Sequence, residues 1–146
     1  MNMAEALQRK IRAAIPLSDA MQFSIESLGL EAIEVSAPLP PNVNIHGTGF
    51  AGSIYSVAVL TGWALCTHIL DQMKVDAELV VAKAEIRYRA PVTGDLRCVA
   101  GADAELRASF LQDIENRGKG VLPLEIRVGE QPAAVLQATF CAIARS

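Results

Sequence analysis

The stretch FAGSIYSVAVLTGWALCTHIL, residues 50–70, decides how this chain folds. No residue within 47–70 carries a formal charge at neutral pH, and apolar side chains occupy every side of a helix drawn through the stretch. A helix that is apolar all round is buried all round, unlike a surface helix with a single apolar stripe. We therefore predict a core helix that starts at Phe50 and ends near Met73.

The same stretch is long enough to span a bilayer, so a membrane helix is the alternative. Residues 47–70 also contain four glycines, several Ser and Thr residues, Tyr55 and His68, and they lie between segments with strand-like patterns. These features favour the core helix of a folded domain. We predict no contact with a membrane.

The composition places the chain among folded proteins. Its 146 residues are the length of one domain, and we treat 1–146 as a single domain. Apolar residues make up 51% and charged residues 20%, a balance that excludes intrinsic disorder. The net charge of −3 comes without the clustered cations that nucleic acid or anionic lipid requires, so neither is predicted as a partner.

The cysteines Cys66, Cys98 and Cys141 form no CxxC pair and no Cys/His set at metal-ligand spacing. Their odd number argues against a disulfide framework, and their spacing argues against a zinc site. The N-terminal segment MNMAEALQRKIRAA carries charges where a signal peptide needs an apolar core. The sequence therefore predicts a cytoplasmic protein without a metal.

Hydrophobic periodicity outside the core helix predicts one antiparallel sheet and two shorter helices. Residues 16–19 are expected to turn the chain, and the three prolines within 38–42 to form a stiff extended loop. The predicted strands are 21–28, 30–38, 77–90, 96–101, 121–128 and 134–144, and the predicted helices are 3–14 and 109–117. This order predicts an α+β fold in which the sheet wraps around the long helix.

The strand predicted at 77–90 is expected to alternate between an apolar and a polar face. Its apolar face consists of Val80, Ala82, Ala84, Ile86 and Tyr88, and its polar face of Lys83, Glu85, Arg87 and Arg89. We therefore predict a half-buried strand that ends at Pro91.

Two segments resemble the hot-dog fold of acyl-CoA thioesterases. One is the strand and turn IRYRAPVTGDL, residues 86–96; the other is PLPPNVNIHGTGFAGS, residues 38–53, followed by Tyr55 and by Gly62-Trp63. The second is similar to a bacterial branch of hot-dog thioesterases that also occurs fused behind a GNAT-type acetyltransferase domain. The resemblance covers residues 15–144, and because no acetyltransferase portion accompanies it, acetyl transfer is not implied.

The resemblance implies the activity and the assembly. The expected substrate is an acyl-CoA or an acyl-carrier protein, with water as the only cosubstrate and no cofactor. The family's sites form at a subunit boundary, which implies a homodimer or a dimer of dimers. Pairing two sheets would also remove an exposed edge from each subunit.

Thioester hydrolysis needs an activated water and donors for the oxyanion that develops on the carbonyl oxygen. The first turn of the core helix leaves backbone N–H groups free, and its small residues let a thioester approach. By position, the amide of Gly52 or Ser53 is the candidate oxyanion donor, as in hot-dog thioesterases. The alternative is that Gly52 only permits tight packing between helix and sheet.

A polar group of residues precedes the core helix. Asn42, Asn44 and His46 alternate, so in an extended loop all three would point toward the helix start. Asn44 and His46 are then candidate catalytic residues and Asn42 a substrate contact; alternatively, the asparagines bond turn backbone and His46 is buried and satisfied. The same segments supply the further candidate substrate contacts Thr48, Phe50, Tyr55 and Ser56.

The sequence departs from the hot-dog pattern at one catalytic position. Many hot-dog thioesterases carry Asp or Glu in the second turn of the helix, whereas here the nearest helix carboxylate, Asp71, lies about 27 Å beyond Ser53. Glu34 or Glu85 could supply the acid from another element. The remaining option uses His46 as the only base. The hydroxyl groups of Ser53, Ser56 and Thr61 would then orient the attacking water.

Arg87 and Arg89 are candidates for binding a phosphate of CoA, because that region of hot-dog proteins lies near the CoA nucleotide; a solvated strand face is the alternative. His68 and Trp63 are expected in the core or at a subunit interface.

Two other functions remain open. A (3R)-hydroxyacyl dehydratase or hydratase would need an acid opposite His46, and none follows in the helix. A non-catalytic acyl-thioester-binding domain would explain the missing helix carboxylate.

Overall fold

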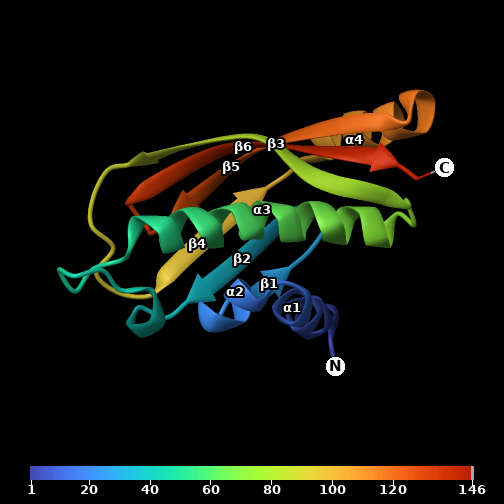
Figure 1. Ribbon diagram of the computed structural model, residues 1–146. Helices are drawn as coiled ribbons and strands as arrows, with labels where there is room; N and C mark the ends of the chain where they lie inside the picture. The colour runs from blue at the N-terminus through green and yellow to red at the C-terminus, as the bar shows by residue number, and fades with distance from the viewer. Residues whose placement is uncertain (146) are drawn as a thin grey trace.

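The computed structural model describes residues 1–145. Six antiparallel strands form one sheet in the order β1-β2-β4-β5-β6-β3, and the sheet curves around the long helix α3 (Figure 1). In chain order the elements are α1 (Met3–Ala14), α2 (Pro16–Ala20), β1 (Ser24–Leu28), β2 (Ala32–Ala37), η1 (Pro40–Asn42), α3 (Ala51–Gln72), β3 (Ala77–Tyr88), β4 (Leu96–Gly101), α4 (Ala104–Arg117), β5 (Lys119–Val128) and β6 (Ala134–Ala144). The predicted α+β fold is confirmed.

The helix α3 is the core helix that the sequence predicts. By length and composition it could cross a membrane, but 72% of its most apolar window is buried inside the protein. It packs against β2, β3, β4, β5 and β6. Gly62 lets it approach the sheet closely, because a Cβ there would lie 2.6 Å from the ring of the fully buried Phe140.

Two predictions for the N-terminal region are wrong. Residues 16–20 form the short helix α2 instead of a turn, because Pro16 at the first position presets a helical φ. The Ser18 hydroxyl, fully buried, donates to the Ile15 carbonyl at 2.6 Å. The prolines at 40 and 41 begin the single 3₁₀ turn η1 instead of an extended loop, and the Asn42 N–H closes it on the Leu39 carbonyl.

The edge strand β3 differs from its predicted alternation. A bulge between Val81 and Lys83 inserts one extra residue, so the two halves of the strand do not share one period. Val81 pairs with the buried Phe140, which places it on the α3 side of the sheet. Val80 therefore lies on the opposite side and is 40% exposed, contrary to the prediction that it shares a face with Ile86.

The helix α4 starts five residues earlier than predicted. Asp103 caps it by accepting the N–H of Leu106, so the helix does not begin at Ser109. Gly118 ends the helix in the left-handed conformation (φ 75°), directly after the predicted last residue.

Candidate functional site

The first turn of α3 presents free backbone donors. Phe50 is its N-cap residue, in an extended conformation and without a side-chain cap. Within residues 1–145 the N–H groups of Ala51, Gly52 and Ser53 have no hydrogen-bond partner. These donors lie at the positive end of the helix dipole, where a negative charge is stabilised.

Gly52 lies against an aromatic ring, not against the sheet. A Cβ there would come within 2.6 Å of the ring of Phe50. Phe50 is 53% exposed, so its ring covers one side of the first turn and remains open to solvent. The predicted alternative, tight packing between helix and sheet, is therefore replaced by packing beneath Phe50.

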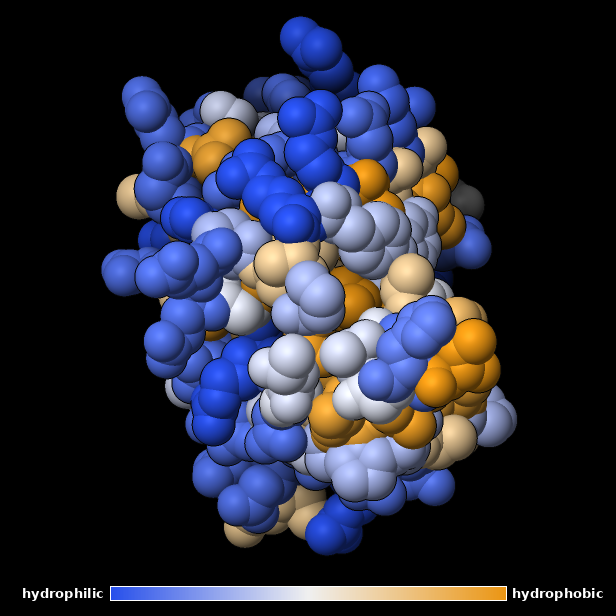
Figure 2. All heavy atoms as spheres, turned by 90° about the vertical axis from the view of Figure 1, so that its left-hand side faces the viewer, coloured by the Kyte–Doolittle hydropathy of each residue, from blue (hydrophilic) through white to orange (hydrophobic). Residues whose placement is uncertain are grey.

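Hydrophobic side chains reach the surface around this helix start. Ile45 is 94% exposed, and Val43 and Phe50 are also exposed. Figure 2 views this end of the molecule and shows hydrophobic residues, in orange, among polar ones in its lower half.

The end of β3 meets the first turn of α3 through Tyr88, which the sequence analysis did not assign to the site. Its hydroxyl donates to the Ala51 carbonyl at 2.8 Å. Burial and, to a smaller extent, the neighbouring Tyr55 raise the pKa of Tyr88. The sequence signal that could have identified Tyr88 was its position as the last residue on the apolar face of the strand before Pro91.

The loop before α3 is a tight turn and not the extended segment that we predicted. Gly47 has φ +79°, and Val43 forms a β-bridge with Gly49. Asn44 holds this turn: its Oδ1 accepts the N–H groups of His46 and Thr48, at 2.8 and 3.1 Å. Its Nδ2 donates to the Thr48 hydroxyl and the Gly49 carbonyl.

The three polar residues of this loop do not converge. Asn42 is 1% exposed and donates to the carbonyls of Met21 and Pro38, which fixes η1. Its Oδ1 is buried without a partner among the described residues. His46 is exposed. The alternative that the asparagines bond backbone is confirmed, and the alternative that His46 is buried is wrong.

The remaining helix candidates differ in burial. Ser53, Tyr55 and Ser56, in the first two turns, are half-buried. Thr61 is fully buried and donates to the Val57 carbonyl, so it cannot orient a water at the helix start.

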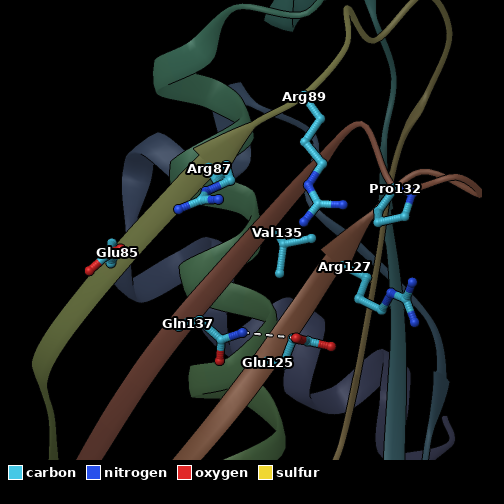
Figure 3. A pocket seen from close by; sticks show the side chains of 8 residues that line it. All are labelled: Glu85, Arg87, Arg89, Glu125, Arg127, Pro132, Val135 and Gln137. Atoms are coloured by element: carbon cyan, nitrogen blue, oxygen red, sulfur yellow. Dashed lines mark hydrogen bonds between the residues drawn. The ribbon is translucent and has the colours of Figure 1, made fainter.

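Arg87 and Arg89 line a pocket of about 340 Å³ on the outer face of the sheet, away from α3. Arg127 of β5 joins them, because Val135 of β6 pairs with Arg87 on one side and with Arg127 on the other. Figure 3 shows the guanidinium group of Arg89 above Val135, with Arg87 and Arg127 on either side. Within residues 1–145 none of these three guanidinium groups forms a hydrogen bond or ion pair.

Arg127 is a site candidate that the sequence analysis missed. The alternation of 121–128 places it on a polar face, but only the strand order brings it within two strands of Arg87, about 10 Å away. The pocket also contains the carboxylates Glu85 and Glu125, the latter bonded to Gln137.

Residues 4–144 match the family described as "Putative thioesterase (yiiD_Cterm)". The chain belongs to this family.

Solved structures of similar proteins agree with this assignment. A Shewanella oneidensis protein with the same "putative thioesterase" description is 35% identical; the match covers 96% of each chain with a TM-score of 0.84. A Chlorobaculum tepidum protein of unknown function is 26% identical, with 97% and 94% of the two chains covered and a TM-score of 0.92. A Haemophilus influenzae thioesterase, 16% identical over 99% and 92% of the chains with a TM-score of 0.73, shares the fold.

The carboxylates that could replace the missing helix acid do not reach the helix start of this thioesterase-family chain. Glu34 and Glu85 line pockets on the outer face of the sheet, opposite α3. Asp71 lies near the far end of α3. None of these three carboxylates therefore lies beside the free amides, and His46 is the titratable side chain of the loop at residues 43–50.

His68 and Trp63 lie in the core and along α3, away from the helix start. His68 is buried, which lowers its pKa, and Asp71 partly offsets this effect. The Trp63 indole N–H points to the Leu79 carbonyl at 3.5 Å.

Proposed function

We propose that this chain hydrolyses acyl thioesters at the N-terminus of α3. The observation that carries the proposal is the group of three unpaired N–H donors of Ala51, Gly52 and Ser53. They belong to the first turn of a 22-residue core helix, and the loop that leads into it exposes the apolar side chains of Val43, Ile45 and Phe50. Membership of the thioesterase family supports the same conclusion.

In the proposed reaction, a water attacks the thioester carbonyl carbon while the amide of Gly52 or Ser53 donates to the carbonyl oxygen. His46 takes the proton from that water, since histidine can accept and return a proton near neutral pH. The C–S bond then breaks, and the proton passes to the departing thiolate. Asn44 acts as a positioning residue, because its side-chain oxygen accepts the backbone N–H of His46.

Arg87, Arg89 and Arg127 are proposed to bind phosphate groups of the thioester's CoA or carrier-protein arm. Guanidinium groups bind phosphate oxygens through charge-assisted hydrogen bonds, and these three have no competing protein partner among the described residues. The arm would cross the edge of β3, since the arginines lie on the outer face and the amides on the inner side. Thr48, Phe50, Tyr55 and Ser56 are the proposed contacts nearer the thioester.

A homodimer, located in the cytoplasm and acting without a cofactor, is part of the proposal. Strand β3 lies at the sheet edge and exposes Val80 and Val81, at 40 and 39%. Beside it, α3 leaves Val59 and Trp63 half-exposed. Pairing of two β3 edges would cover both surfaces and remove an unpaired edge from each subunit. The relation to chains that carry a GNAT-type domain stays a prediction.

A non-catalytic acyl-thioester-binding domain is the second candidate, favoured by the absence of a carboxylate from the first turns of α3. A dehydratase or hydratase is less well supported, because Glu34 and Glu85 both face away from α3.

The first experiment measures CoA release from a panel of acyl-CoAs with a thiol-trapping dye. Hydrolysis that disappears in His46→Ala supports the proposal. Binding of acyl-CoA without turnover in the wild type favours the binding domain instead.

The second experiment tests phosphate binding by the arginines. Arg87→Gln and Arg127→Gln should raise KM for an acyl-CoA and leave KM unchanged for the acyl-N-acetylcysteamine thioester, which has no phosphate. An equal KM change for both substrates would contradict phosphate binding.

Light scattering tests the proposed dimer. It should give twice the monomer mass at micromolar concentration, and a stable monomer would contradict the dimer.

A further inference from the structure

The helix α3 is joined to the edge strand β3 by two side-chain hydrogen bonds among the described residues. The Trp63 indole donates to the Leu79 carbonyl at 3.5 Å, which is long for a hydrogen bond. The Tyr88 hydroxyl donates to the Ala51 carbonyl at 2.8 Å, at the opposite end of the strand. The second bond is therefore the stronger tie, and it lies at the first residue of the helix.

The first turn of α3 has few other side-chain restraints. It has no side-chain N-cap, and its entry is fixed through two backbone bonds, from the Phe50 N–H to the Asn42 carbonyl and from the Gly49 N–H to the Val92 carbonyl. The Ala51 carbonyl already accepts the Tyr55 N–H of the helix, and its second lone pair takes the Tyr88 hydroxyl. Among the described side chains, this phenol is the one that bonds the first turn of α3 to the end of β3.

We infer that Tyr88 is a positioning residue for hydrolysis: its hydroxyl holds the first turn of α3, and with it the amides of Gly52 and Ser53, against the end of β3. The inference rests on the proposed function. Oxyanion donors act by being held in place before the charge develops. Movement of the first turn should therefore lower kcat more than it weakens substrate binding.

The neighbours of Tyr88 extend this role. Successive strand residues point to opposite faces, so Arg87 and Arg89 project to the outer pocket while Tyr88 points to α3. A phosphate bound by either arginine would therefore fix the same short segment that holds the helix start.

The test compares Tyr88→Phe with the wild type. Tyr88 is 46% exposed, so removing its hydroxyl leaves the ring in place and opens no core cavity. We expect kcat for an acyl-CoA to fall about 2- to 13-fold, the change that corresponds to one net hydrogen bond, with KM unchanged. Hydrogen exchange at the N–H groups of Ile54 and Tyr55, which close the first turn, should increase by a similar factor.

Ser36→Ala is the matched control, because it also removes a hydroxyl that donates a hydrogen bond, to Glu26 on a distant strand. It should change neither kcat nor the exchange of Ile54 and Tyr55. If the wild type hydrolyses thioesters and Tyr88→Phe has the same kcat, the positioning role is overturned. If the wild type hydrolyses none, the proposed function fails, and unchanged exchange in Tyr88→Phe would then also overturn the structural part of the inference.

Discussion

Replacing Gly62 by alanine should destabilise the fold, although alanine is the better helix former. A Cβ at Gly62 would lie 2.6 and 2.7 Å from two ring carbons of Phe140 and 3.2 Å from the Cδ1 of Ile126. Phe140 and Ile126 are both fully buried, so neither can swing into solvent. The new methyl group would therefore lie about 1 Å inside the normal carbon–carbon contact of about 3.5–4.0 Å.

Two opposing terms set the size of the effect. The Gly→Ala change alone favours a helix by about 1 kcal/mol. Overpacking a filled core costs about 1–3 kcal/mol, and contact with two immobile residues places Gly62→Ala at the upper end of that range. The net loss is about 2 kcal/mol, or roughly 4–8 °C in Tm for a domain of this size.

Urea unfolding followed by circular dichroism measures this loss. Gly52→Ala is the control in the same helix, because its Cβ meets only the half-exposed ring of Phe50; we expect a change within about 0.5 kcal/mol. Phe140→Leu should relieve the overlap, so the double variant should be more stable than the two single losses predict, with a coupling of about 0.5–3 kcal/mol. A Gly62→Ala protein as stable as the wild type would refute the packing argument.

Three further predictions concern the loop, the buried histidine and the thiols. Asn44→Ala removes the side chain that holds the turn before α3 and should lower the free energy of unfolding by about 1–3 kcal/mol; Asn44→Asp, which keeps both acceptor contacts, should lose less, as urea titrations can show. Burial lowers the pKa of His68, so as pH falls below about 6.5 the unfolded chain takes up a proton that the folded chain refuses, and stability should fall. That decline, measured as urea midpoints from pH 8 to pH 5, should be smaller in His68→Gln. Burial raises the pKa of the Cys98 thiol to about 12, so at pH 8 a thiol reagent should label it only after unfolding.

The fold was predictable because its main signal needs no long-range information. Residues 50–70 lack charge on every side, so the helix must be buried all round. The alternation of the flanking segments then predicts the strands. The bulge in β3 was missed, because the four apolar residues 79–82 interrupt the alternation without showing which face each side chain takes.

The loop before α3 shows where pattern reasoning fails. Alternation predicts a common direction for Asn42, Asn44 and His46 only if the backbone is extended. The left-handed Gly47 and the hydrogen bonds of Asn44 make a turn instead. Asparagine can satisfy backbone groups as readily as a substrate, so its presence alone does not separate the two roles.

Two site residues could not be predicted from the sequence, because their roles depend on which elements lie side by side in the fold. Arg127 becomes a neighbour of Arg87 only through the register of β6 between them. Tyr88 becomes a site residue only because β3 returns to the start of α3, 37 positions along the chain.

Because the first turns of α3 contain no carboxylate, the proposed hydrolysis relies on backbone N–H groups and on a loop histidine. Backbone donors stabilise an oxyanion only when their positions are fixed. In this chain the elements that fix them are the turn before α3 and the edge strand β3. An edge strand has a neighbour on one side only, so β3 depends on β6, α3 and whatever covers its free edge. If a second copy pairs with that edge, it would also restrain Tyr88, which holds the helix start. Activity should then decline on dilution below the dimer's dissociation constant, even though every residue of the proposed reaction comes from one chain. Specific activity measured across a dilution series, beside light scattering on the same samples, tests this coupling; constant activity in a population of monomers would contradict it.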